Sequence, residues 1–352
     1  MGQPERGLRA VVAVPLGEDL CRLVEQIEPR LELVRDHDLL PPTRGPGDWS
    51  GDPTFRRTAD QQRAFDALVD SADALFGIPD VDPAALHRTV AANPRLRWVM
   101  TTAAGGGAQI RDADLPREAL ERLTFTTSAG VHGAPLTEFA VLGVLVGAKD
   151  LPRLQSDQRD HRWPDRWRMR HLVDMTVLVV GLGGIGATTA RTLSALGAKV
   201  WGVNRRGAAV DGVSRTFPLA ELAAVVPHVD AVVLTLPGTA ATHHAVGEEV
   251  LAAVRPGTIL VNVGRGTAVD EDALIRALDD GRIGFAALDV VEREPLAADS
   301  PLWDHPRVLL SPHTAALSAD EDERIARRFA EDARRLIDGE PLTSVVDTVE
   351  FY

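Results

Sequence analysis

The sequence contains a single cysteine, Cys21, among its 352 residues. One cysteine cannot close a disulfide within the chain, and such scarcity is typical of reducing compartments. We therefore expect a cytoplasmic protein. Most free cysteines are small buried hydrophobic side chains, so we expect Cys21 to be buried on a helix and not to act as a nucleophile.

Long hydrophobic runs and positive charge are also scarce. No stretch of about 18 apolar residues occurs, which argues against a membrane-spanning helix. The first six residues lack the apolar segment of a secretory signal. Lysine and arginine number 38 against 51 aspartates and glutamates, which gives a net charge of −13. An acidic surface repels phosphate backbones, so we expect no nucleic-acid partner and no membrane partner.

The composition is that of a globular protein, with 45% hydrophobic and 25% charged residues. In the first third of the chain, apolar runs alternate with helical patterns. The runs lie at 8–14, 31–34, 74–76 and 96–100, and the helical patterns at 60–69 and 83–92. This alternation predicts a parallel α/β sheet. A stretch rich in proline, glycine and aspartate, 41–58, interrupts it and indicates a surface insertion.

A second alternation begins near residue 175. Strands are predicted at 177–180, 199–203, 231–236, 259–263, 285–288 and 308–310, with helices at 185–196 and 271–278. Such continuous apolar strands indicate a sheet covered on both faces. Helical patterns at 137–149 and 320–337 lie before and after this second alternation, and we expect them to connect the two domains. We predict two Rossmann-like or flavodoxin-like α/β domains: a nucleotide domain, 131–314, inserted into a split substrate domain, 1–130 and 315–352.

A glycine-rich turn follows the predicted strand 177–180 and opens the helix 185–196. Its members are Gly181, Leu182, Gly183, Gly184, Ile185 and Gly186. The glycines suit a tight turn, close approach of a pyrophosphate, and packing of helix on strand. The start of the helix offers free N–H groups to phosphates. The motif alone could be a structural turn, but its place between strand and helix predicts dinucleotide binding.

The end of the next strand, 199–203, bears on the choice of dinucleotide. An NAD site usually has an acid about 20 residues past the glycines, which binds the ribose 2′-hydroxyl. Here Asn204, Arg205 and Arg206 follow the strand. Guanidinium groups can grip a 2′-phosphate that a carboxylate would repel. We therefore expect NADP(H) to be preferred, with NAD(H) possible; the alternative is a solvated basic turn.

Three polar residues follow later strands of the same predicted sheet: Arg265, Glu294 and His313. An arginine fork matches a substrate carboxylate, and a histidine titrates near working pH, which suits a proton donor. A neighbouring carboxylate favours the imidazolium form. Taken singly, each could be solvated or structural. Together they suggest reduction of a keto acid.

These motifs together resemble the D-isomer-specific 2-hydroxyacid dehydrogenase family. The resemblance rests on 179–186, 260–266, 288–296, 300–303 and 311–313, in family order and spacing. It implies that Arg265 binds the substrate's carboxylate and carbonyl oxygen. His313 would donate the proton in reduction, with Glu294 raising its proton affinity. Asp289 would hold the nicotinamide carboxamide, and the cofactor site would extend over Leu236, Pro237 and Val263. No metal is expected.

The resemblance also assigns a substrate loop in the first domain, made of Ala104, Gly105, Gly106 and Gly107. The family loop usually ends in a β-branched residue and an acid, and the two glycines here suggest a looser pocket. Further departures are Gly264, where alanine is common, and the run 314–316 after the histidine. Neither removes a reacting group.

Family members usually form dimers through the helix near 137–149, so a homodimer is expected. The segment 155–171 contains Trp163 and Trp167. It either crosses to the partner and lines its pocket or forms an exposed loop with aromatic anchors. The chain ends soon after residue 347, which makes a serine-regulated phosphoglycerate dehydrogenase less expected.

The favoured function is that of an NADP(H)-dependent reductase of glyoxylate, hydroxypyruvate or a similar 2-keto acid. The alternatives are an NAD-dependent dehydrogenase of the same family and a dinucleotide-sensing protein like the corepressors that share the fold.

Overall fold

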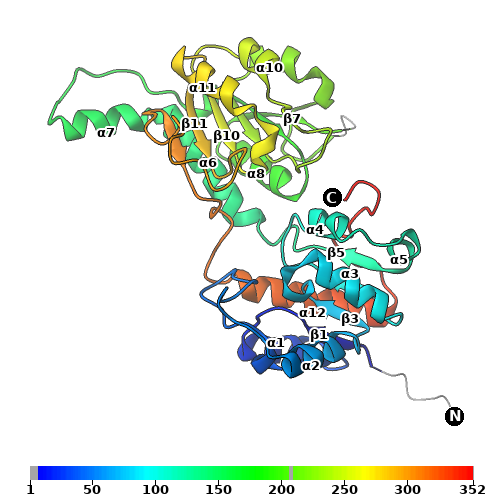
Figure 1. Cartoon of the computed structure of the whole chain (residues 1–352). Helices are drawn as coiled ribbons and strands as arrows, with labels where there is room; N and C mark the ends of the chain where they lie inside the picture. Colours follow the sequence, from blue (N-terminus) through cyan, green and yellow to red (C-terminus); the bar gives the residue numbers. More distant parts are fainter. Residues whose placement is uncertain (1–6, 206–208, 352) are drawn as a thin grey trace. The chain divides into compact units, whose positions relative to one another are not determined.

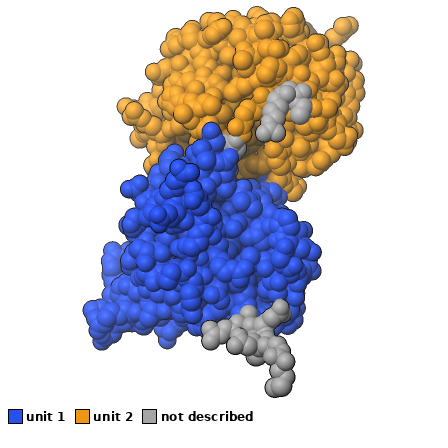
Figure 2. Space-filling model, turned by 90° about the vertical axis from the view of Figure 1, so that its right-hand side faces the viewer, with its two compact units in different colours: residues 1–132, 317–352 blue, residues 133–316 orange. Residues whose placement is uncertain are grey.

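The chain forms two compact units, 1–132 with 317–352 and 133–316 (Figure 2). The computed structural model describes residues 7–205 and 209–351. The expected domain boundaries, at 130/131 and 314/315, fall two residues from the observed divisions. The unit 1–132 with 317–352 is called unit 1 below, and 133–316 is called unit 2.

Unit 1 is built on a five-stranded parallel sheet with the strand order β2-β1-β3-β4-β5. The strands are β1 (Arg9–Val12), β2 (Glu32–Val34), β3 (Ala74–Phe76), β4 (Trp98–Met100) and β5 (Thr124–Thr126). This is the flavodoxin-like order, in which the chain changes direction along the sheet between β1 and β3. All of β3 and β4 is buried, as expected for strands covered on both faces.

The helices of unit 1 come from both ends of the chain (Figure 1). They are α1 (Glu18–Ile27), α2 (Ala59–Val69), α3 (Pro83–Ala92), α4 (Gly107–Asp112), α5 (Arg117–Arg122) and α12 (Glu321–Asp338). A capping box of Thr58 and Gln61 starts α2, and such reciprocal bonds satisfy free N–H groups at a helix start. Phe329 of α12 stacks on Trp98 with ring centroids 4.7 Å apart, so the C-terminal helix completes the core of the N-terminal sheet.

Unit 2 is built on a seven-stranded parallel sheet with the order β12-β11-β10-β9-β6-β7-β8. The strands are β6 (Thr176–Val180), β7 (Lys199–Val203), β8 (Arg215–Phe217), β9 (Ala231–Leu234), β10 (Thr258–Asn262), β11 (Ile283–Leu288) and β12 (Val308–Leu310). The order of the first six in sequence is that of a Rossmann fold, with its change of direction between β6 and β9. The predicted fold class is confirmed.

Successive side chains of these strands enter different cores, because side chains alternate across a strand. Leu178 and Val180 belong to one buried cluster, and Val177 and Val179 to another. The covering helices are α6 (Gly133–Lys149), α8 (Gly184–Ala195), α9 (Leu222–Val225), α10 (Glu248–Ala253) and α11 (Glu271–Asp279). The sheet is therefore covered on both faces, as its apolar strands predict.

Helix α6 lies directly against this sheet. A Cβ atom at Gly143 would be 2.8 Å from that of Ala287 on β11, so glycine lets the helix backbone approach the strand. Helix α7 (Leu151–Arg159) follows and extends away from the rest of unit 2 (Figure 1). Short 3-10 helices lie at His37–Leu39, Pro79–Val81, Leu172–Asp174, Leu219–Glu221, Val226–His228 and Gly266–Ala268. Within the described ranges, no helix has the length and apolar character needed to cross a membrane.

Candidate active site

The glycine-rich turn connects β6 to α8, and two of its glycines are required by close contacts. Gly181 has a φ of +96°, a left-handed conformation that favours glycine. A Cβ at Gly186 would lie 1.8 Å from the carbonyl oxygen of Gly181. That carbonyl accepts a hydrogen bond from Thr235 Oγ1 at 2.5 Å. The turn is thus clamped between the first turn of α8 and the end of β9.

Gly183 differs from these two because it faces open space. Apart from its two neighbours in the chain, no described residue has an atom within 4 Å of a Cβ built there. Gly183 and Gly184 are exposed at the start of α8. A helix start concentrates N–H donors and partial positive charge. The turn therefore has the exposed backbone that a pyrophosphate requires, at the strand pair where Rossmann sheets bind ligands.

The neighbouring strand end contains the residues expected near the adenosine ribose. The backbone N–H of Asn204 donates to the carbonyl of Phe217 at 3.1 Å, which ties the end of β7 to β8. Asn204 is half-buried and Arg205 is exposed. Arg206 lies outside the described residues. Recognition of a 2′-phosphate stays a prediction for all three.

Leu236, Pro237 and Val263 lie past the carboxyl ends of β9, which pairs with β6, and of β10, the strand beyond β9. Leu236 and Val263 are buried. The N–H of Val263 donates to the carbonyl of Leu234 at 3.1 Å, and the carbonyl of Pro237 accepts from Thr242 Oγ1 at 2.6 Å. These bonds hold both strand ends in register at the edge where the glycine-rich turn lies.

Arg265 stands in a turn that Asn262 organises. Asn262 Oδ1 accepts from the N–H of Gly264 at 3.0 Å, and its Nδ2 donates to the carbonyl of Arg265 at 3.0 Å. A Cβ at Gly266 would lie 1.8 Å from the carbonyl oxygen of Val291, so only glycine fits. Burial lowers the pKa of Arg265, and the charge of Glu294 partly offsets this. Arg265 remains a cation and lies within electrostatic range of Glu294.

His313 and Glu294 are paired. His313 Nδ1 lies 2.7 Å from Glu294 Oε2, and both side chains are partly exposed, at 46% and 39%. A carboxylate at Nδ1 orients the ring and leaves Nε2 for other partners. The structure thus brings two of the three predicted catalytic residues into contact, with the third, Arg265, nearby.

Asp289 has a structural role that the sequence did not reveal. Its Oδ1 accepts from Ser311 Oγ at 2.7 Å and from the N–H groups of Thr314 and Ala315 at 3.0 and 2.9 Å. Its carbonyl accepts from the N–H of His313 at 2.9 Å. One buried aspartate therefore fixes the loop that presents His313. An acid at a strand end followed by a serine at the next strand end is the signal that could have indicated this.

The predicted substrate loop lies in unit 1, at the start of α4. Gly105 is exposed and Ala104 half-buried, whereas Gly106 and Gly107 are buried. A Cβ at Gly106 would lie 1.9 Å from Thr101 Oγ1. The space that a side chain at 106 would occupy is therefore filled by Thr101, which limits how loose this part of the loop is.

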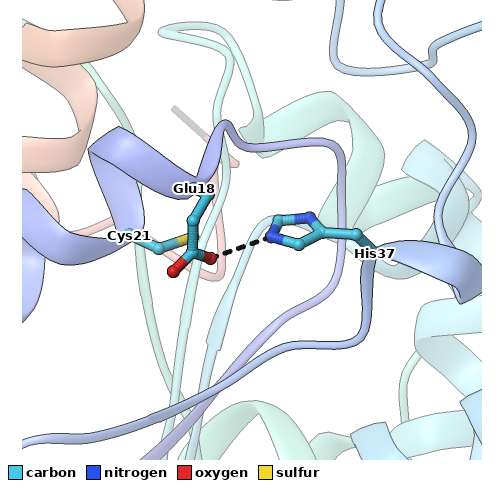
Figure 3. A group of neighbouring side chains, drawn as sticks. All are labelled: Glu18, Cys21 and His37. Carbon is cyan, nitrogen blue, oxygen red and sulfur yellow. Dashed lines mark hydrogen bonds and ion pairs between the residues drawn. The ribbon is translucent and has the colours of Figure 1, made fainter.

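Cys21 has surroundings that suit a buried structural residue. It is fully buried on α1, and burial raises the pKa of its thiol to about 12. Glu18 and His37 lie beside it, with Glu18 Oε2 and His37 Nε2 3.1 Å apart (Figure 3). Hydrogen bonds from Arg35 and then His37 lower the pKa of Glu18 to about 2. A thiol that keeps its proton is a poor nucleophile and metal ligand. The expected burial of Cys21 on a helix is confirmed.

Comparison with known proteins identifies the family to which the chain belongs. Residues 141–315 match the family model described as D-isomer specific 2-hydroxyacid dehydrogenase, NAD binding domain. A glyoxylate/hydroxypyruvate reductase A of Salmonella dublin is 32% identical over 277 residues, 74% of this chain and 83% of that relative. The chain belongs to the D-isomer specific 2-hydroxyacid dehydrogenase family. The predicted family is therefore confirmed.

Two further comparisons place this dehydrogenase-family chain more closely. A structure of a family member from Xanthobacter autotrophicus Py2, in complex with NADPH and MES, is 31% identical with a TM-score of 0.76, covering 99% of this chain and 100% of that one. A D-3-phosphoglycerate dehydrogenase of Mycobacterium bovis is 31% identical over 284 residues, 80% of this chain. The chain spans only about half of that relative's length, 52%.

One departure from the family pattern has a local explanation. A Cβ at Gly264, where alanine is common, would lie 2.7 Å from the backbone N and O of Leu236. The close approach of these two strand ends therefore requires glycine in this member of the family. The reacting group beside it, Arg265, is unaffected.

The tryptophans after α7 differ from each other in exposure. Trp163 is 99% exposed, whereas the Trp167 ring lies under the guanidinium of Arg153, with its carbon 4.0 Å from the ring centroid. The first residues of the expected loop 155–171 belong to α7, which ends at Arg159. Trp163 therefore follows α7 with almost no covering residues among those described.

Proposed function

We propose that the chain is an NADP(H)-dependent oxidoreductase that interconverts a small 2-keto acid and the D-2-hydroxy acid, as glyoxylate or hydroxypyruvate reductases do. The observation that carries the proposal is the His313–Glu294 pair at 2.7 Å with Arg265 within electrostatic range. In this proposal unit 2 binds the nucleotide, and the loop 104–107 is a substrate-binding loop of unit 1.

The roles of the residues follow from their chemistry. Arg265 binds the substrate carboxylate and carbonyl oxygen, because its fork donates in a plane that matches them. His313, protonated and oriented by Glu294, donates a proton from Nε2 to the carbonyl oxygen as that oxygen gains negative charge. In the opposite direction His313 accepts the proton. Asp289 holds the His313 loop and, as proposed from the family resemblance, the nicotinamide carboxamide.

The residues of unit 2 fit a dinucleotide. The open space at Gly183 and the exposed start of α8 suit a pyrophosphate, and Arg205 suits a 2′-phosphate. When bound, the nicotinamide supplies or accepts the hydride. The NADPH-bound relative at 31% identity supports this choice of cofactor.

The first test is turnover. Purified protein should oxidise NADPH when glyoxylate, hydroxypyruvate or a related 2-keto acid is added, measured at 340 nm. Replacing His313 by alanine should lower kcat by about 10²- to 10⁴-fold, the usual contribution of a general acid. His228→Ala changes a histidine that precedes β9, at the opposite end of the strand from the candidate site. This variant should leave kcat unchanged. Full activity of His313→Ala would refute the assigned mechanism.

Cofactor choice and enzyme class have their own readouts. A higher kcat/KM with NADH than with NADPH would favour the NAD-dependent alternative. Tight NADPH binding without turnover on a broad keto-acid panel would favour a dinucleotide sensor.

We also propose a homodimer. Leu142 of α6 is 47% exposed and Trp163 after α7 is 99% exposed, and large exposed apolar side chains mark interaction surfaces. Sedimentation equilibrium should give twice the chain mass, and Trp163→Ser together with Leu142→Ser should shift it to the monomer. A monomeric wild-type protein at micromolar concentration would contradict this.

A further inference from the structure

Unit 1 contains a pocket of about 390 Å³ that none of the residues assigned above lines. Its wall includes Val14 and Pro15, which follow β1, and Asp80, which follows β3. These are the two strands between which the chain changes direction along the sheet. Open α/β sheets bind ligands at the carboxyl ends of such strands, and the volume is within the range of small-molecule sites, roughly 300–1,000 Å³.

The segment 41–58, which the sequence indicated as a surface insertion, supplies most of the remaining wall. Contacts within unit 1 fix it in place. The N–H of Gly47 donates to Asp322 Oδ1 on α12 at 2.9 Å, and the Trp49 ring lies 5.8 Å from that of Phe76 on β3. The insertion is therefore a shaped wall and not a loose loop.

Two arginines of this segment line the pocket. Arg57 is nearly buried, with a side chain 7% exposed and 2.9 Å from the carboxylate of Asp80. Its guanidinium carbon lies 3.7 Å from the Phe65 ring centroid. Its Nη2 is buried and has no hydrogen-bond partner among the described residues. A buried N–H group without an acceptor is costly, so the wall contains an unsatisfied cationic donor.

Arg56 is exposed and forms no ion pair with another described residue. Its Nη1 donates to the carbonyls of Pro53 and Phe55 at 2.6 and 2.7 Å, which are neutral acceptors. Of the acids in the same wall, Asp80 pairs with Arg57, and Asp52 Oδ1 accepts two hydrogen bonds from Thr54. Those hydrogen bonds, and then the charges of Arg44 and Arg56, lower the pKa of Asp52. The rim therefore holds a guanidinium group whose position is set by two backbone carbonyls.

We propose that this pocket is a second anion subsite, which takes the distal carboxylate of a 2-keto diacid whose keto-acid end is bound at the loop 104–107. The inference rests on the proposed function. The loop follows β4, and β3 is the only strand between β4 and β1 in the sheet. Neighbouring strands lie about 4.8 Å apart, so loop and pocket are roughly 5–10 Å apart, the reach of a chain of about five carbons.

The test compares two five-carbon substrates that differ only at the far end, 2-oxoglutarate and 2-oxopentanoate. With NADPH, the wild-type protein should favour the diacid by about tenfold or more in kcat/KM, as expected for a charge-assisted hydrogen bond. Arg56→Ala should remove about tenfold for the diacid, mainly through KM, and leave 2-oxopentanoate and glyoxylate within about twofold. The matched control is Arg44→Ala, an exposed arginine of the same segment paired with Asp48, which should change none of them.

Two results would overturn the subsite: a wild-type preference for 2-oxopentanoate, or an equal effect of Arg56→Ala on all three substrates. A second measurement does not depend on turnover. Glutarate, which has no keto group, should bind wild-type protein in isothermal titration calorimetry and bind Arg56→Ala about tenfold more weakly. If glutarate binding depends on Arg56 but no keto acid is turned over, the proposed function is refuted and the subsite is upheld. If glutarate does not bind the wild-type protein, the subsite is refuted.

Discussion

The two sheets of this molecule differ in how much of their structure is local. In unit 2 the strands β6, β7 and β10 have five residues each and β11 has six. In unit 1 every strand has three or four. A longer buried strand has more apolar residues in register, so its end is defined by its own sequence. A three-residue strand ends where neighbouring elements stop pairing with it.

This difference explains why candidate catalytic residues could be recognised from the sequence in unit 2 and the pocket of unit 1 could not. Arg265 and Asp289 follow well-defined strand ends of unit 2, β10 and β11, so their relative positions follow from the parallel sheet. The His313 loop follows the three-residue strand β12, and its position is fixed by Asp289. In unit 1 the ligand-facing edge depends on the segment 41–58, whose shape comes from contacts with α12 and β3. Substitutions can separate these two kinds of structure.

The largest effect is expected within the glycine-rich turn. Gly186→Ala places a Cβ 1.8 Å from the carbonyl oxygen of Gly181, so the backbone must move. We expect a loss of about 3 kcal/mol or more in the stability of unit 2, the upper part of the range for overpacking. Thermal unfolding followed by circular dichroism, with hydrogen exchange of the β6 amides, would measure it.

The matched control is Gly183→Ala in the same turn, where a Cβ meets open space. Its stability should stay within about 1 kcal/mol of the wild type, while its affinity for NADPH should fall at least about tenfold, because the methyl group occupies the approach of the pyrophosphate. Equal stability of the two variants would contradict the role assigned to Gly186.

A second effect concerns the pair that orients the acid. Glu294→Gln keeps the size of the side chain but replaces the carboxylate at His313 Nδ1 by a neutral amide, which weakens the hydrogen bond that orients the ring. We expect kcat of reduction to fall about 10- to 100-fold, measured with NADPH and a 2-keto acid at one fixed pH. A Glu292→Gln variant, two residues away, is the control and should retain the wild-type kcat. A wild-type kcat for Glu294→Gln would mean that the carboxylate takes no part in the reaction.

The sequence predicted six of the seven strands of unit 2 to within about two residues and missed β8, as it missed β5 in unit 1. Among the helices it placed the start of α6 four residues late and did not indicate α7, α9 or α10. Both are three-residue edge strands, Arg215–Phe217 and Thr124–Thr126, with too few apolar residues to form a pattern. Their pairing is decided by the neighbouring strands β7 and β4, which a local pattern does not contain.

The same limit applies within the candidate site. Arg265, Glu294 and His313 could be predicted because their residue types and strand-end positions have a chemical reason. The supporting contacts could not, since they join residues distant in sequence: Asp289 with Thr314, or Thr101 with the space beside Gly106. The pocket of unit 1 was missed because the segment 41–58 has the composition of a surface loop, and only its contacts show that it forms a wall.

A third effect tests the nucleotide preference of unit 2. Arg205→Ala should raise the KM for NADPH about tenfold and leave that for NADH within about twofold, because only NADPH carries the 2′-phosphate. Lys199 is the matched control, since it begins the same strand that Arg205 follows. Lys199→Ala should change neither constant. An equal loss with both cofactors would show that Arg205 acts on features that they share.

The smallest effect concerns unit 1, where Asp332 of α12 holds the chain near its C-terminal end. Asp332 Oδ1 accepts from the N–H of Thr343 at 3.0 Å and from its Oγ1 at 2.9 Å. Burial raises the pKa of Asp332 above 3.8, although these hydrogen bonds oppose the shift.

The folded state therefore keeps a proton that the unfolded state has lost, so the free energy of unfolding falls as the pH rises from about 3.8 through the raised pKa, and is constant above it. Asp332→Asn should remove this fall in urea unfolding measured between pH 4 and 8. Asp338→Asn, at the end of the same helix, is a control of opposite sign, because Arg30 lowers the pKa of Asp338 and its contribution is lost as the pH falls. If the Asp332→Asn variant has the same pH dependence as the wild type, this carboxyl group is not what makes the stability of unit 1 depend on pH.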